Sequence, residues 1–245
     1  MGFADRFANS LDAVSDRDFV AEALFDLALI GTHLSRIGEE WVLWTSEEFG
    51  FATLDDRYAT GSSMLPQKKN ADIAELARGK AGRLIGNLTG LLTTLKGLPL
   101  AYNRDLQEDK EPLFDSYDQV SLAVGALTGM IQTATFNAER MRAAADVQSL
   151  SATDLAEYLV RKGTPFRQAH AIVGALVQEA LSGSQSLLQL VANSPEFDAD
   201  AQQLIGPGVG VQLRSSPGAA GPLAADDQRA RFASTIASLR TSLAI

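Results

Sequence analysis

The sequence predicts an all-α protein that combines a bundle of long helices with a smaller helical domain at the C-terminal end. Two observations carry this prediction. Apolar residues recur at steps of three and four over three segments of about 25–35 residues, which is the spacing of one face of an α-helix. Short stretches rich in glycine, proline and polar residues separate these segments, and such stretches are typical of the connections between the helices of a bundle.

Three long helices are expected over residues 16–49, 70–95 and 111–145. Ser15 precedes the first of them and is a suitable N-cap, because its hydroxyl can accept a backbone N–H of the first turn. A Gly-Leu-Pro sequence at 97–99 ends the second helix. The apolar face expected for the first helix consists of Val20, Leu24, Leu27, Ile30, Leu34, Ile37, Trp41 and Trp44.

A change of composition divides the expected bundle domain, residues 1–147, from the smaller helical domain, residues 148–245. The three long helices carry apolar residues on more than one face, so association with further helices is expected. The alternative is that the smaller domain covers this surface. Shorter helices are expected in the smaller domain over residues 153–162, 165–181, 184–191 and 226–243, with irregular structure over 205–223.

Composition excludes several classes of function. The net charge of -9 and the pI of about 4.7 argue against nucleic acid and anionic membranes as main partners, although a local group of cations could still hold an anionic substrate. The absence of cysteine excludes disulfides and thiolate metal sites and fits a reducing cytoplasm. No stretch of about 20 apolar residues is free of charge, so no transmembrane helix is expected.

The most informative segment is residues 61–70, Gly-Ser-Ser-Met-Leu-Pro-Gln-Lys-Lys-Asn. It is a polar loop that leads into the start of a helix. Serine hydroxyls, backbone amides, two lysines and the positive end of the helix come together within ten residues, and they suit a carboxylate or a developing oxyanion. On spacing alone, a solvated basic loop remains the alternative.

This segment is similar to the signature loop of the fumarase/aspartase superfamily. Longer blocks resemble the argininosuccinate lyase family in particular, and they lie at residues 9–13, 67–70, 102–111 and 154–156. Two positions depart from the family pattern: Leu65 stands where the family usually has methionine, and Ala71 where it usually has proline. Neither change removes a functional group, so neither is expected to inactivate the loop.

The resemblance implies a reversible elimination in arginine biosynthesis, in which argininosuccinate is cleaved to arginine and fumarate without a cofactor or a metal. Ser62 matches the family's base, and its hydroxyl can act as one only where its alkoxide is stabilised. Lys68 matches the cation that stabilises the carbanion, and Glu75 matches the acid that pairs with a catalytic-site histidine. Glu75 could instead be a surface carboxylate that pairs with Arg78 one turn away.

Other positions match residues that contact the substrate or support the site. The family's substrate contacts correspond to Ser63, Asn70, Tyr102, Gln107 and Lys110, and its structural ion-pair set near the site corresponds to Arg17 and Asp109. Lys110 could instead simply begin a solvated helix. His33 lies within an apolar helical stripe, which favours a core histidine over a catalytic one.

Members of this family are about twice as long as the present chain, and they form homotetramers whose active sites draw on three subunits. The chain therefore resembles the C-terminal half of such an enzyme, and it is expected to need the upstream half to complete a site. Two other functions stay open. One is a non-catalytic structural protein, like the related delta-crystallins, or a degenerate fragment. The other is a sister enzyme such as adenylosuccinate lyase or fumarase.

Overall fold

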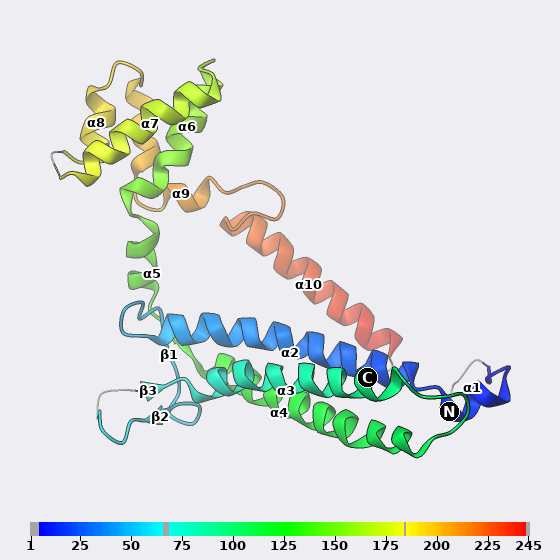
Figure 1. The fold of residues 1–245 in the computed structure, drawn as a ribbon. Coiled ribbons are helices and arrows are strands. Elements are labelled where there is room, and N and C mark those ends of the chain that lie inside the picture. The colour runs from blue at the N-terminus through cyan, green and yellow to red at the C-terminus, as the bar shows by residue number, and fades with distance from the viewer. Residues whose placement is uncertain (1–4, 66–68, 184, 244–245) are drawn as a thin grey trace. The chain divides into compact units, whose positions relative to one another are not determined.

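The computed structural model describes residues 5–65, 69–183 and 185–243, and nearly all of its regular structure is helical, which confirms the all-α prediction (Figure 1). The chain divides into two compact units, residues 1–137 and residues 138–245. This division differs from the expected boundary after residue 147 by one short helix, α5 (Ala138–Ala145). None of the helices in the described residues is long and apolar enough to cross a membrane.

Unit 1 is built on three long helices that lie side by side: α2 (Asp18–Thr45), α3 (Asp72–Leu95) and α4 (Lys110–Thr133) (Figure 1). A short helix, α1 (Ser10–Ser15), precedes them, and a 3₁₀ helix, η1 (Arg104–Asp109), leads into α4. The core runs along the whole bundle. Its buried residues include Val20, Leu24 and Leu91 at one end, Ala28, Leu84 and Val120 in the middle, and Trp41, Ala74 and Met130 at the other end.

Small residues of α2 let it approach α3 closely, next to the large apolar residues of the core. A side-chain carbon added at Gly38 would overlap the carbonyl oxygen of Ala74, and one added at Gly31 would overlap the side chain of Leu84. The expected apolar face of α2 is therefore wrong in part. Ile30 and Ile37 are exposed, whereas Ala28, Gly31 and Gly38 are buried.

We expect Gly38→Ala to destabilise unit 1 by about 1–3 kcal/mol, because the new methyl group meets the backbone of α3, which cannot move aside without separating the helices. Gly79→Ala is the matched control, since nothing lies within 4 Å of the added carbon and alanine favours a helix by about 1 kcal/mol. Denaturant unfolding of both variants measures the difference. Equal stabilities would contradict the close approach of α2 and α3.

The start of the first long helix differs from the prediction. Ser15 is the last residue of α1 and is not an N-cap, and α2 begins at Asp18 after Arg17, whose side chain makes no capping hydrogen bond. Asn9 is the N-cap of α1, and its side-chain Oδ1 accepts the backbone N–H of Leu11 at 2.8 Å. The chain therefore enters the bundle through a short capped helix followed by a break.

The end of the third long helix also differs from the prediction, because α4 stops at Thr133 and does not continue to residue 145. The chain then forms β4 (Thr135–Phe136), which pairs antiparallel with β1 (Ala52–Thr53). Residues 52 and 136 are direct partners in this pair. The pairing joins the loop after α2 to the end of α4 and interrupts the helix.

Unit 2 is a helical domain around one core, which includes Leu155, Leu159, Val173, Val191 and Ile205. The carboxylate of Asp154, which is buried, receives two hydrogen bonds from the guanidinium of Arg214, at 2.6 and 3.1 Å. The elements of unit 2 that follow α5 are η2 (Gln148–Ser151), α6 (Ala152–Arg161), α7 (Phe166–Leu181), α8 (Leu187–Asn193), η3 (Ala199–Ile205), α9 (Val209–Gln212) and α10 (Pro222–Ser242).

Candidate functional site

Gly61, Lys69 and Asn70, which lie at the two ends of the expected signature loop, belong to a small β-hairpin. Its strands, β2 (Thr60–Gly61) and β3 (Lys69–Asn70), pair antiparallel, with residue 60 opposite 70 and residue 61 opposite 69. Ala71 separates β3 from the first residue of α3, and its φ of −82° is close to the value that proline imposes. The hairpin thus presents the loop at the N-terminal end of α3.

Ser62 lies where backbone amides surround its hydroxyl. Its Oγ accepts the N–H of Met64 at 3.2 Å and the N–H of Leu65 at 3.1 Å. Two donors on one hydroxyl oxygen favour a negative charge there, because each hydrogen bond strengthens when its acceptor becomes an anion. This arrangement lowers the cost of a Ser62 alkoxide.

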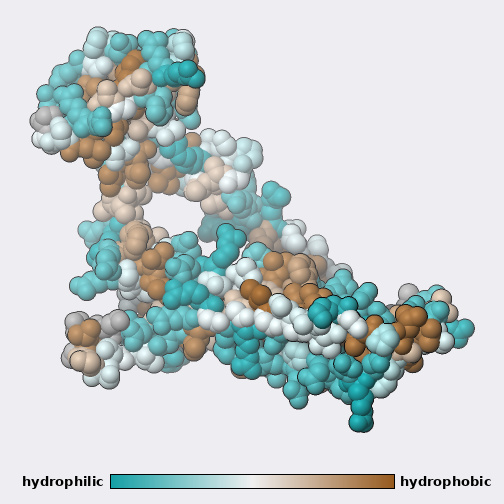
Figure 2. Space-filling view, in the orientation of Figure 1, coloured by the Kyte–Doolittle hydropathy of each residue, from teal (hydrophilic) through white to brown (hydrophobic). Residues whose placement is uncertain are grey.

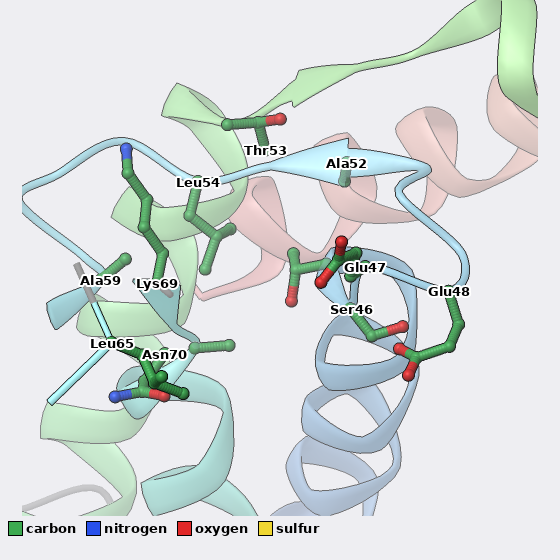
Figure 3. Close-up of a pocket in the computed structure, with 12 residues that line it drawn as sticks. Ser46, Glu47, Glu48, Ala52, Thr53, Leu54, Ala59, Leu65, Lys69 and Asn70 are labelled. Atoms are coloured by element: carbon green, nitrogen blue, oxygen red, sulfur yellow. The ribbon is translucent and has the colours of Figure 1, made fainter. Parts of the chain in front are cut away.

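A cavity of about 580 Å³ lies beside the hairpin (Figure 3). Asn70, Lys69 and Leu65 line it from the side of the hairpin, and the turn that follows α2 lines it from the other side, with Glu47 and Glu48 (Figure 3). The side chain of Lys69 forms an ion pair with Asp56. Asn70, expected to bind the substrate, therefore borders a cavity, whereas Ser62 and Ser63 do not line it.

Three further residues singled out in the sequence lie away from this cavity or outside the described part of the chain. Lys68, the expected cation for the carbanion, lies outside the described residues. Glu75 is exposed on the first turns of α3, and Arg78 forms its ion pair with Glu39 of α2, at 2.5 Å, rather than with Glu75. His33 is exposed on α2, so its interpretation as a core histidine is wrong.

The second group of expected substrate contacts lies on and beside η1. The side-chain amide of Gln107 donates a hydrogen bond to the hydroxyl of Tyr102. Lys110, the first residue of α4, is exposed, and its Nζ donates to Asp109 at 2.8 Å. Just before Tyr102, the backbone of Ala101 adopts a φ of +68°, a left-handed conformation that costs a non-glycine residue energy. Tyr102, Gln107 and Lys110 lie within nine residues of the chain and are called here the Tyr102 group.

Arg17 and Asp109 form an ion pair at 2.5 Å, with side chains only 15% and 9% exposed. Burial raises the pKa of Asp109, but hydrogen bonds from Lys110 and Arg17 outweigh it, so the pKa of this carboxyl is lowered overall. The pair joins the residue before α2 to the last residue of η1.

We expect Asp109→Ala to lower the free energy of unfolding by about 1–3 kcal/mol at neutral pH, because the mostly buried Arg17 guanidinium loses its carboxylate partner and keeps the backbone carbonyl of Asp16. The lowered pKa fixes the pH dependence. The contribution of Asp109 is fully present above the unfolded aspartate pKa of about 3.9 and is lost as the pH falls through the lower folded value. Denaturant unfolding of wild type and variant at neutral and acidic pH tests this, and a difference that does not shrink in acid would contradict it.

The structure places the two groups of expected site residues at opposite ends of unit 1 (Figure 1). The loop over 61–70 leads into the start of α3, and residues 102–110 follow its end. Since α3 has 24 residues, a rise of 1.5 Å per residue separates the groups by about 36 Å. One copy of this chain cannot bring both groups to the same substrate.

Sequence analysis missed the acidic side chains that contact the hairpin. The carboxylate of Asp72 accepts the backbone N–H of Thr60 at 2.8 Å, and Asp56 pairs with Lys69. It also missed the turn over residues 45–48 that lines the cavity. Asp72 carried a usable signal, because an acidic residue directly after the loop and at the start of a helix is typical of an N-terminal anchor. The other contacts depend on tertiary structure.

Comparison with known proteins identifies the family. A family model described as lyase matches residues 2–86, and one described as argininosuccinate lyase C-terminal matches residues 149–211. The chain is 56% identical over 227 residues to an argininosuccinate lyase of Frankia casuarinae, covering 91% of this chain and 49% of that protein. It is 52% identical over 248 residues to one of Moorella thermoacetica, covering 99% of this chain and 53% of that protein.

Solved structures agree with these matches. EDDS lyase in complex with formate is 31% identical, with a TM-score of 0.86 over 97% of this chain and 50% of that chain. A class II fumarase of Schistosoma mansoni shares the fold, with a TM-score of 0.71 at 16% identity, over 82% of this chain and 41% of its own. The chain spans about half the length of the curated relatives that it matches. It belongs to the argininosuccinate lyase family, within the fumarase/aspartase superfamily.

Proposed function

We propose that this chain supplies part of the active site of an argininosuccinate lyase. This carbon–nitrogen lyase would cleave argininosuccinate reversibly to arginine and fumarate, as a step of arginine biosynthesis in the cytoplasm. The observation that carries the proposal is the Ser62 hydroxyl, which two backbone amides of its own loop prepare for a negative charge. The names of the relatives, at about half identity over most of this chain, indicate the substrate.

Each expected site residue has a separate role in the proposed elimination. Ser62, as an alkoxide, takes the proton from the carbon next to a substrate carboxylate, and the electron pair that remains moves into that carboxylate. Lys68 balances the negative charge that develops there, and Asn70 holds the same carboxylate by hydrogen bonds. The bond between the neighbouring carbon and the guanidinium nitrogen then breaks, the carbon–carbon double bond of fumarate forms, and an acid protonates the nitrogen. Glu75 would orient a histidine from another segment.

We further propose that the complete site combines several chain segments in a homotetramer. The separation of the two site groups supports this, because the Ser62 loop and the Tyr102 group can meet at one substrate only when they come from different copies. Large apolar side chains stay exposed on the bundle, including Phe25 on α2 and Leu122 on α4. Figure 2 shows apolar patches among polar ones on the face in view. Packing of bundles against each other would cover such surface.

The direct test is release of fumarate from argininosuccinate. We would assay the 245-residue chain alone and together with the part of the Frankia casuarinae relative that lies outside its match to this chain, called here the complementing segment. Activity in the mixture and not in the chain alone is the expected result. No activity in either, with folding confirmed by circular dichroism, would contradict the proposal and favour a structural role.

A substrate panel tests the identity of the lyase. Argininosuccinate, adenylosuccinate, malate and EDDS are offered in parallel to the complemented protein, because EDDS lyase is among the solved structures that resemble this chain. We expect turnover of argininosuccinate at a rate at least tenfold above that of the others, since a site built for polar groups of one substrate leaves them unpaired with another. Preference for any other member of the panel would overturn the assignment of substrate.

A further inference from the structure

We propose that Asp72 is a positioning residue for the elimination. Its carboxylate attaches strand β2, which directly precedes Ser62, to the first turn of α3. The inference deepens the proposed function and rests on it, because it concerns the placement of the same base. Asp72 does not line the cavity beside the hairpin, and the structure gives it no role in contacting a substrate.

The geometry of the anchor is simple. Asp72 is the first residue of α3, and its Oδ2 accepts the backbone N–H of Thr60 at 2.8 Å. Thr60 begins β2 and lies two residues before Ser62. The hydrogen bond spans 12 positions of the sequence, so it closes the whole loop rather than a local turn. It therefore connects the base to a rigid 24-residue helix through two residues of backbone.

The hairpin needs such an anchor because it is very short. Each strand has two residues, and a hairpin of this size is not stable by itself in water. Strand β3 continues through Ala71 directly into α3, so its position follows that of the helix. Strand β2 has no such covalent connection. Besides pairing with β3, strand β2 is attached to the start of α3 by the Asp72 hydrogen bond.

The position of Asp72 favours a strong hydrogen bond. Asp72 lies in the first turn of α3, near the positive end of the helix dipole, which is a favourable place for an acidic side chain. A charged acceptor makes a stronger hydrogen bond with a backbone N–H than a neutral one does. Asp72 is also only partly exposed, which limits competition from water. The same carboxylate thus stabilises the helix start and holds β2.

Positioning of this kind affects the rate more than the affinity. A misplacement of about 1 Å can cost roughly 100-fold in rate, because the base no longer lies within reach of the proton. Of the residues expected to bind the substrate, Ser63 shares the loop with Ser62. The others stay in place, since Asn70 belongs to β3 and the Tyr102 group lies at the other end of the bundle. Loss of the anchor should therefore lower kcat and leave KM nearly unchanged.

The test compares three variants in the complemented protein. Asp72→Ala removes the acceptor, and we expect kcat to fall about 10- to 100-fold with KM changed by less than about threefold. Asp72→Asn keeps an amide oxygen for the Thr60 N–H, and we expect it to restore kcat to within about fivefold of wild type. Asp56→Asn is the matched control. It removes the same charge next to the same hairpin but only an exposed ion pair, so we expect a change of less than about twofold.

Hydrogen exchange measured by mass spectrometry gives a readout that needs no activity. In Asp72→Ala, the amides of residues 58–65 should exchange at least about tenfold faster than in wild type, while those in the middle of α3 should not change. A wild-type rate of turnover and an unchanged KM in Asp72→Ala would overturn the inference, as would equal exchange. If wild type itself fails to cleave argininosuccinate, the proposed function falls, and exchange alone then decides whether Asp72 anchors the loop.

Discussion

Ser62→Ala should lower kcat of the complemented protein by about 100- to 10,000-fold, the range that a positioned general base contributes. The substitution removes the oxygen that two backbone amides surround, so no alkoxide can form at this place. Substrate affinity should change little, because the expected carboxylate contacts, Asn70 and Lys68, are untouched. Steady-state kinetics with argininosuccinate and direct binding by calorimetry together measure both quantities.

The control for this substitution is Ser121→Ala, which removes an exposed hydroxyl from α4 and should leave kcat unchanged. Ser62 could act as the base or could organise the loop, because its hydroxyl also accepts hydrogen bonds from the amides of Met64 and Leu65. The measured affinity for the substrate distinguishes these two roles. A variant that loses affinity as much as rate would show that Ser62 organises the loop and does not take the proton. Retained turnover would exclude it from both roles.

Lys110→Met should lower kcat/KM by about 30-fold or more, because removing one member of a charged pair that is buried in the complex costs about 2–5 kcal/mol. Methionine keeps most of the apolar stem and removes only the charge. The side chain of Lys110 is about half exposed in this chain, which leaves it accessible to a ligand. The ion pair between Arg17 and Asp109 remains, so the bundle should stay folded. Kinetics with argininosuccinate measure the effect, and thermal unfolding confirms the fold.

Lys96→Met is the matched control for Lys110→Met. Lys96 is the exposed C-cap residue of α3 and lies at the same end of the bundle. It carries the same charge but belongs to no group of expected site residues. We expect its kcat/KM to stay within about twofold of wild type, because an isolated surface charge contributes little. Equal losses of kcat/KM in the two variants would mean that the overall positive charge at this end of the bundle attracts the substrate, rather than a direct contact with Lys110.

Much of the fold could be predicted because helical periodicity is a local property. The second long helix was expected at residues 70–95 and is found at 72–95. Other features depend on contacts between distant residues. The third helix ends at Thr133 because β4 pairs with β1, more than 80 positions earlier in the sequence. The α2–α3 contact uses glycine and alanine, which an analysis of large apolar residues does not identify.

The candidate site was only partly predictable for a similar reason. The resemblance identified the residues of the loop and of the Tyr102 group, and it identified Arg17 and Asp109, which lie 92 positions apart. Periodicity cannot find such a pair. The sequence did contain a signal for the separation of the two groups, because a helix of about 25 residues was expected between them. The anchor from Asp72 to Thr60 depends on how the hairpin folds back, and composition does not show that.

Mixing two inactive variants tests most directly whether the site combines residues from different copies of this chain. Ser62→Ala and Lys110→Met are each purified with the complementing segment, unfolded, mixed in equal amounts and refolded. If one site takes the Ser62 loop from one copy and Lys110 from another, random assembly gives about a quarter of sites with both residues intact. We expect fumarate release to rise to about a quarter of the wild-type rate. Activity no higher than the sum of the two separate variants would contradict a site shared between copies.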